Sequence, residues 1–128
     1  MSVRVVRLGS TRSRGEGLRI GTVRRPPRGI PKARWASGNW FDVWYPNLAP
    51  SLPVMKLGLA VETASEWKAY VRKYTKEMST PERRHDLALL AALSHVTDFS
   101  VGCYCEDESR CHRSILRKLL VEHGAKLT

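Results

Sequence analysis

The clearest hydrophobic pattern of the chain lies near its C terminus, over residues 99–124. Its first part alternates like a buried strand, with one face formed by Phe99, Val101, Cys103 and Cys105. The acidic run at 106–109 has no apolar periodicity and predicts a turn. Apolar residues then recur at helical spacing until Gly124, a residue typical of a helix end. The pattern predicts a strand, a loop and a helix that begins near Cys111.

Further elements are predicted along the rest of the chain. Residues 3–8 and 18–23 predict two short strands, whereas residues 24–31 contain too many prolines for a helix or a central strand. Residues 63–66 form a capping box, and Thr80-Pro81 favours the start of another helix.

The segment 35–45 is rich in aromatic residues. We expect a strand there, with one face formed by Phe41, Val43 and Tyr45. Such a cluster usually belongs to a core, although aromatic side chains beside basic ones also stack on nucleic-acid bases. Ser51 is a candidate cap for a short helix that reaches Leu57.

This order of elements predicts an α/β fold, as a single small domain over residues 1–128 with a mainly parallel sheet flanked by helices. The strand at 99–105 is nearly continuously apolar, which is typical of a central parallel strand. We therefore expect it to be central and parallel to 3–8, with helices on both faces of the sheet.

Composition indicates a cytoplasmic protein with its own core. The 128 residues are 42% hydrophobic, and the three cysteines, an odd number without repeated spacing, suit a reducing compartment. No apolar run approaches the length of a membrane span, so we expect no membrane partner.

Charge is concentrated in the basic segment 1–34. Of the net charge of +10, this segment carries +9, because it holds ten Lys or Arg residues and the single acid Glu16. Such a bias indicates an anionic small molecule or a nucleic acid as partner.

Reactive side chains gather where the strand at 99–105 leads into the next helix. In open α/β sheets, ligands bind at this end of the strands. The candidate catalytic residues are Cys111, His112, Arg113 and Glu106. The candidate substrate- or anion-binding residues are Arg24, Arg28, Cys103 and Arg110.

Cys111 is the central candidate, because helix amide donors and nearby cations stabilise a thiolate or a bound anion. It would be a nucleophile, a redox thiol or only an anchor of the helix start, and we expect it to be the most reactive of the three thiols. His112 would act as acid or base or orient the ligand, and Glu106 would be a general acid or base. Arg113 and Arg28 would hold an anion.

Zinc is an alternative for this stretch, since four potential ligands occur within ten residues: Cys103, Cys105, Cys111 and His112. Structural zinc sites usually space their cysteines as C-x2–4-C, whereas here the first pair is C-x-C and the last pair is adjacent. Adjacent side chains do not easily converge on one tetrahedral ion, so we predict no metal site. Cys103 and Cys105 are then small buried hydrophobic residues.

The pattern C-x(7)-C-H-R at 103–113 resembles domain-of-unknown-function family 488, particularly its YeaO-like branch. Residues 24–29 are similar to the arginine-x-x-proline-arginine-glycine loop of that family, and 47–51 to its leucine-alanine-proline-serine helix start. Cys105 stands where the family carries a glutamate, and Val23 where it carries an aspartate. The resemblance implies a compact Rossmann-like α/β domain and no settled function.

The sequence supports two candidate functions. The first is an anion- or small-molecule-binding and thiol site at the Cys-His-Arg motif, in an enzyme or a binding protein. The alternative is a sequence-nonspecific nucleic-acid-binding module that uses the basic segment 1–34. No motif identifies a cofactor, and nothing in the sequence indicates an oligomeric state.

Overall fold

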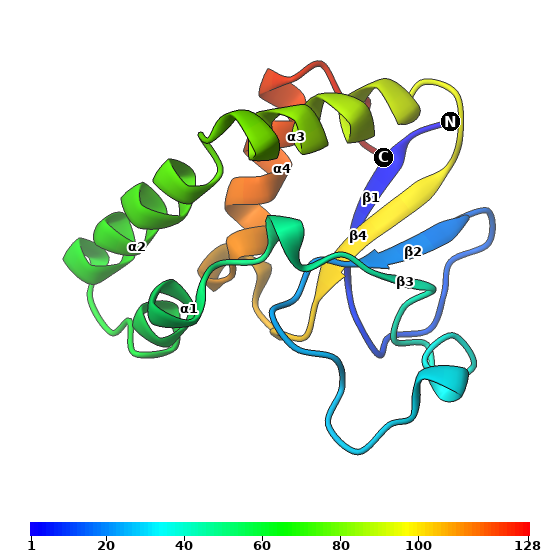
Figure 1. The fold of residues 1–128 in the computed structure, drawn as a ribbon, viewed down its shortest axis with the longest axis horizontal. Helices are drawn as coiled ribbons and strands as arrows, with labels where there is room; N and C mark the ends of the chain where they lie inside the picture. The colour runs from blue at the N-terminus through cyan, green and yellow to red at the C-terminus, as the bar shows by residue number, and fades with distance from the viewer.

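The computed structural model describes residues 1–128 and contains one four-stranded sheet and four α-helices (Figure 1). The strands are β1 (Val3–Arg7), β2 (Leu18–Gly21), β3 (Val43–Trp44) and β4 (Phe99–Cys103). The α-helices are α1 (Leu52–Leu59), α2 (Ala64–Glu77), α3 (Pro81–Leu93) and α4 (His112–Glu122). Short 3-10 helices are η1 (Lys32–Arg34), η2 (Pro46–Leu48) and η3 (Glu108–Arg110). None of the helices combines the length and the apolar character needed to cross a membrane.

The sheet is parallel throughout, in the order β1-β4-β2-β3. All five residues of β4 are buried, and β4 lies between β1 and β2. In register, Val5 pairs with Val101, which in turn pairs with Ile20. The predicted central parallel strand and the small α/β domain are confirmed.

The main core lies between the four helices and one face of the sheet. That face supplies Val3, Ile20, Phe99 and Val101. The helices supply buried residues from each of α1 to α4: Val54, Tyr70, Tyr74, Leu87, Leu90, Ile115, Leu116, Leu119 and Leu120. Figure 1 shows the helices gathered on one side of the sheet. The expectation of helices on both faces is therefore wrong.

Loops cover the second face, and two glycines make room for them. An added Cβ at Gly21 would lie 2.3 Å from the ring of Phe41, and one at Gly102 would lie 2.7 Å from Leu8. Phe41 and Leu8 belong to a smaller core cluster with Val23, Cys103 and Cys111. A side chain at either glycine would displace Phe41 or Leu8. The two glycines therefore let the loops pack closely on this face of the sheet.

A buried ion pair also lies on the second face. The Arg19 guanidinium donates to both carboxylate oxygens of Glu16, at 2.7 and 2.9 Å, and both side chains are almost fully buried. Ser100 of β4 donates a further hydrogen bond to the same carboxylate. The pair thus joins the loop before β2 to the central strand.

The predicted helix starts are confirmed, whereas the aromatic strand is shorter than expected. Thr63 and Glu66 form the reciprocal capping box of α2, and the Thr80 side chain accepts from the third residue of α3. The segment 35–45 contains only the two-residue β3, whose side chains are exposed. Phe41 instead precedes the strand and packs on the second face of the sheet, so tertiary packing overrode the alternation.

Candidate active site

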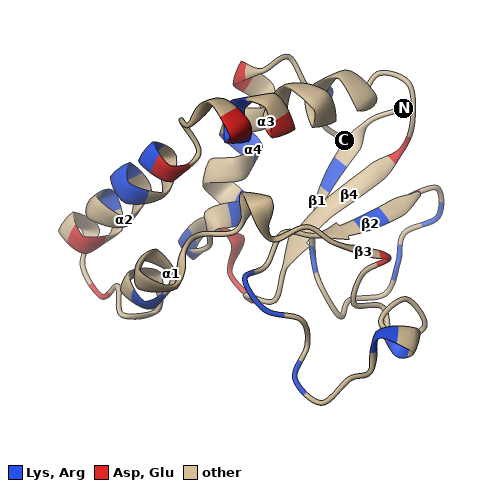
Figure 2. Cartoon of the chain, in the orientation of Figure 1, with Lys and Arg blue, Asp and Glu red and all other residues tan.

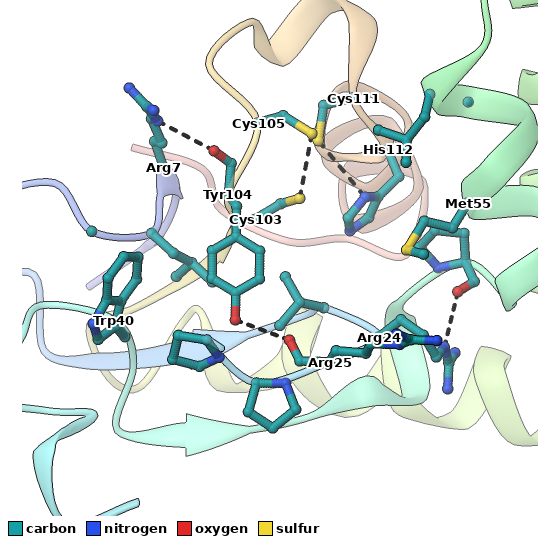
Figure 3. Close-up of a pocket in the computed structure, with 18 of the residues that line it drawn as sticks. Arg7, Arg24, Arg25, Trp40, Met55, Cys103, Tyr104, Cys105, Cys111 and His112 are labelled. Atoms are coloured by element: carbon teal, nitrogen blue, oxygen red, sulfur yellow. Dashed lines mark hydrogen bonds between the residues drawn. The ribbon is translucent and has the colours of Figure 1, made fainter. Parts of the chain in front are cut away.

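The carboxyl ends of β1, β2 and β4 border one cavity of about 840 Å³. The residues that follow these strands line it, together with the 24–30 loop and part of α1 (Figure 3). This is the sheet edge at which α/β proteins bind ligands, because the loops diverge there. The predicted position of the site is therefore occupied by a cavity of ligand size.

The three cysteines and His112 converge at one end of the cavity (Figure 3). Cys103 ends β4, and its Sγ lies 3.7 Å from the Sγ of Cys105. Cys111 is the N-cap residue of α4, and its Sγ lies 3.7 Å from Nδ1 of His112. The ligand atoms of Cys103, Cys111 and His112 all lie within 4.8 Å of one another.

A backbone carbonyl fixes the His112 ring. Its Nε2 lies 2.8 Å from the carbonyl oxygen of Thr22, which can only accept a hydrogen bond. Nε2 therefore carries a proton, and in the neutral ring Nδ1 presents its lone pair toward Cys111. Thr22 is itself held by β4, because its amide and its hydroxyl both donate to the carbonyl of Gly102.

The three thiols differ in the direction in which their pKa values are shifted. Hydrogen bonding to Cys105 and Cys111, together with burial, raises the pKa of Cys103 well above its usual range. Hydrogen bonds from Cys103 and Cys111, aided by the charge of Arg113, lower the pKa of Cys105 to about 3 against the effect of burial. Hydrogen bonding to Cys103 also lowers the pKa of Cys111. These opposite shifts favour negative charge on Cys105 over Cys103.

Arg113 lies behind the cluster and does not line the cavity. It is 3% exposed and donates to the carbonyl oxygen of Cys105. Its Nε has no hydrogen-bond partner, and no carboxylate forms a salt bridge with it. A buried cation without a carboxylate requires another negative group nearby, and the sulfur cluster is the adjacent one.

Five arginines line the cavity, with no aspartate or glutamate among its lining residues: Arg7, Arg24, Arg25, Arg28 and Arg110. Arg24 is anchored, because its guanidinium donates to the carbonyls of Pro46, Ala49 and Pro50. Arg110 lies over the ring of Trp67, with its guanidinium carbon 5.5 Å from the ring centroid.

Arg25 and Arg28 are exposed, and neither side chain forms a hydrogen bond or a salt bridge within the chain. Their charges are therefore available to a bound anion.

Glu106 does not reach this site. Its side chain is 84% exposed, it does not line the cavity, and its carboxylate lies 3.7 Å from the guanidinium of Arg7. The acid–base role expected for Glu106 from the sequence therefore has no support in this geometry.

Sequence reasoning missed three contributors to the site. Arg7 ends β1 next to β4, so the parallel pairing of these strands could have predicted its place at the site. Thr22 acts through its backbone carbonyl, which leaves no signal in the sequence. Tyr104 lines the cavity and donates its hydroxyl hydrogen to the carbonyl of Arg25, which ties the strand end to the basic loop.

Comparison with known families gives one match. Residues 3–124 match the family model DUF488-N3a, described as the active DUF488-N3 subclade. The chain belongs to this family. No curated protein and no solved structure matches it. The resemblance to family 488 drawn from the Cys-His-Arg motif is thereby confirmed.

At two positions this DUF488-N3a chain departs from the acidic residues expected from the family resemblance, and both positions lie beside the site. Cys105, at the position expected to hold glutamate, adds a third sulfur next to Cys103. Val23, at the position expected to hold aspartate, is buried in the small core cluster and lines the cavity. The cavity thus has sulfur and apolar surface where carboxylates were expected, and among its arginines only Arg7 forms a salt bridge, with Glu106.

Proposed function

We propose that the protein binds an anionic small molecule in the arginine-lined cavity and that the cysteine–histidine cluster is where the bound molecule reacts. The observation that carries this proposal is the cavity itself, which combines five arginines, no carboxylate and the cluster of three thiols and an imidazole. Arginine guanidinium groups bind phosphate and carboxylate in two-point geometry. The family description as an active subclade supports a reacting centre in this chain.

The walls of the cavity favour a ligand with an apolar part. Ile30, Trp40, Met55 and Tyr70 line it together with the arginines and the thiols. An anionic group held by Arg25 and Arg28 would leave the rest of the molecule against these side chains. An aromatic or aliphatic phosphate or carboxylate therefore matches the cavity better than a bare inorganic ion.

Calorimetric titration with phenyl phosphate tests this proposal, with inorganic phosphate and phenol as partial probes. We expect phenyl phosphate to bind more tightly than either of them. The double variant Arg25→Gln/Arg28→Gln should lose at least about tenfold in affinity, because a charge-assisted hydrogen bond contributes about 1.5–3 kcal/mol.

Arg14→Gln is the matched control. Arg14 is exposed in the same basic segment but does not line the cavity. Equal losses in the Arg14 variant and the double variant would show attraction by overall charge and would remove the cavity from the proposal.

Nucleic acid is the second candidate partner. Exposed basic residues on the segment that precedes β3 support it: Arg14, Arg25, Arg28, Lys32 and Arg34 (Figure 2). Two other arginines of the segment are already paired with carboxylates, Arg12 with Asp42 and Arg19 with Glu16. Binding of this kind would be indifferent to sequence and would fall steeply with salt. A titration of the same variants with a DNA oligonucleotide tests it: Arg14→Gln should then weaken oligonucleotide binding as much as the double variant Arg25→Gln/Arg28→Gln does.

A further inference from the structure

The ligand atoms of Cys103, Cys111 and His112 lie within 4.8 Å of one another at the end of the cavity, and Cys105 lies beside Cys103. The distance from Cys103 Sγ to Cys105 Sγ and the distance from Cys111 Sγ to His112 Nδ1 are both 3.7 Å. In a tetrahedral zinc site with Zn–S of about 2.3 Å and Zn–N of about 2.0–2.1 Å, neighbouring ligand atoms lie about 3.5–3.8 Å apart. We propose that Cys103, Cys111 and His112 hold a zinc ion and that Cys105, 3.7 Å from Cys103, supplies the fourth ligand.

The orientation of His112 supports metal binding independently of the distances. Metal-bound histidines almost always donate their second ring N–H to a carbonyl or a carboxylate, which fixes the tautomer and the ring. His112 has this arrangement, with Nε2 held by the carbonyl of Thr22 and Nδ1 facing the sulfur atoms. His112 is 4% exposed, and the cost of burying its polar ring is offset when both ring nitrogens have a partner, a hydrogen bond at one and a metal ion at the other.

The surrounding charge also fits. Three thiolates and one Zn²⁺ carry a net charge of one negative unit, and the buried cation beside them is Arg113. This guanidinium has no carboxylate partner, and its Nε is unsatisfied. An anionic zinc–thiolate centre would supply the negative charge that a buried arginine requires.

The structure removes the objection that adjacent residues cannot share an ion. Cys111 has extended backbone angles, with φ −127° and ψ 154°, whereas His112 is the first residue of α4. This change of backbone direction between neighbours turns both side chains toward Cys103. All four proposed ligands line the cavity, and Cys105 is the most exposed of them, so it is the ligand that a bound molecule would reach most easily.

Metal analysis of the untagged protein tests the proposal. Purified from zinc-supplemented medium and dialysed, the chain should contain one zinc ion, and Co²⁺ substitution should give sulfur-to-metal charge-transfer bands with the visible bands of tetrahedral cobalt. Cys111→Ser should lose the zinc and these bands, whereas His85→Ala should retain both, because His85 is exposed and outside the cluster.

The wild-type result alone can overturn the inference, whatever the folding of the variants. A dialysed protein without zinc that also fails to take up Zn²⁺ against a chromophoric chelator, or one that holds iron in place of zinc, contradicts it. Zinc loading does not require the anion of the cavity, because none of the arginines that line the cavity is among the proposed zinc ligands. The double variant Arg25→Gln/Arg28→Gln should lose phenyl phosphate binding and keep its zinc, so the two proposals fail separately.

Discussion

At the scale of single residues, the three cysteines differ most in their access to solvent. Cys111 is 2% exposed and Cys103 is 7% exposed, whereas Cys105 is only half-buried and faces the cavity. The position of Cys111 at a helix start had favoured it as the most reactive thiol. Because an alkylating reagent must reach the sulfur, exposure now favours Cys105.

We therefore expect Cys105 to be alkylated first when the chain has been treated with a chelator and kept folded. Iodoacetamide labelling, followed in time by peptide mass spectrometry, measures the three sites separately. In denaturant the three thiols should react at similar rates, which provides the control. If Cys111 is labelled before Cys105 in the folded chain, access to solvent does not determine the order.

At the scale of elements, the helix starts show which sequence signals have structural consequences. Thr63 accepts a hydrogen bond from the amide of Glu66, and the Glu66 carboxylate accepts one from the amide of Thr63. Ser51 occupies the same N-cap position before α1, yet its side chain makes no capping hydrogen bond. The same residue class therefore contributes differently at the two helices.

Thr63→Ala should lower the free energy of unfolding by about 1 kcal/mol, the usual contribution of an N-cap hydrogen bond. Ser51→Ala is the matched control and should cost less, because no capping bond is lost. Urea denaturation of both variants provides the comparison. Equal decreases in the free energy of unfolding of the two variants would mean that the helix propensity of the substituted residue, rather than the capping hydrogen bond, determines the loss of stability.

At the scale of the whole molecule, the sheet separates an apolar core from a face closed by loops. The buried pair of Glu16 and Arg19 closes part of that second face and bonds to Ser100 of the central strand. Burial raises the pKa of Glu16, but hydrogen bonds from Arg19, the Ser13 amide and Ser100 outweigh it and bring the pKa to about 2. The loop before β2 is thus held on this face by an ion pair, in addition to the apolar packing of Phe41 and Leu8 on the same face.

This pKa makes stability depend on pH. The folded chain holds the Glu16 proton more weakly than the unfolded chain, so the pair stabilises the fold above pH 4.5 and loses its contribution as the pH falls toward about 2. Glu16→Gln should therefore lower the free energy of unfolding by about 3 kcal/mol at pH 7, because it leaves Arg19 buried without a partner charge. The difference from the wild type should shrink through this pH range.

Denaturant unfolding at a series of pH values measures that difference, with the exposed Glu122→Gln as control. The control should follow the wild type at every pH. A constant gap between wild type and Glu16→Gln down to the lowest pH would exclude an ionised Glu16 as the source of the stability.

Much of this protein was determined by local sequence. Alternation and capping residues predicted β1, β4 and the helices α2, α3 and α4, because backbone propensity and apolar periodicity act over a few residues. The apolar run of β4 indicated a central parallel strand, and the Cys-His-Arg motif indicated the family. The sequence also indicated the strand end beside which the cavity lies, since a strand that leads into a helix is a local feature.

Only the tertiary structure decided what the site contains. It turned Cys111 and His112 toward Cys103, brought the arginines of the 24–30 loop to the same cavity and placed Glu106 on the surface. It also covered the second face of the sheet with loops, because Phe41 packs on Gly21 and Leu8 on Gly102. Contacts of this kind join residues far apart in the chain, so their side-chain directions depend on the whole packing and not on any one segment.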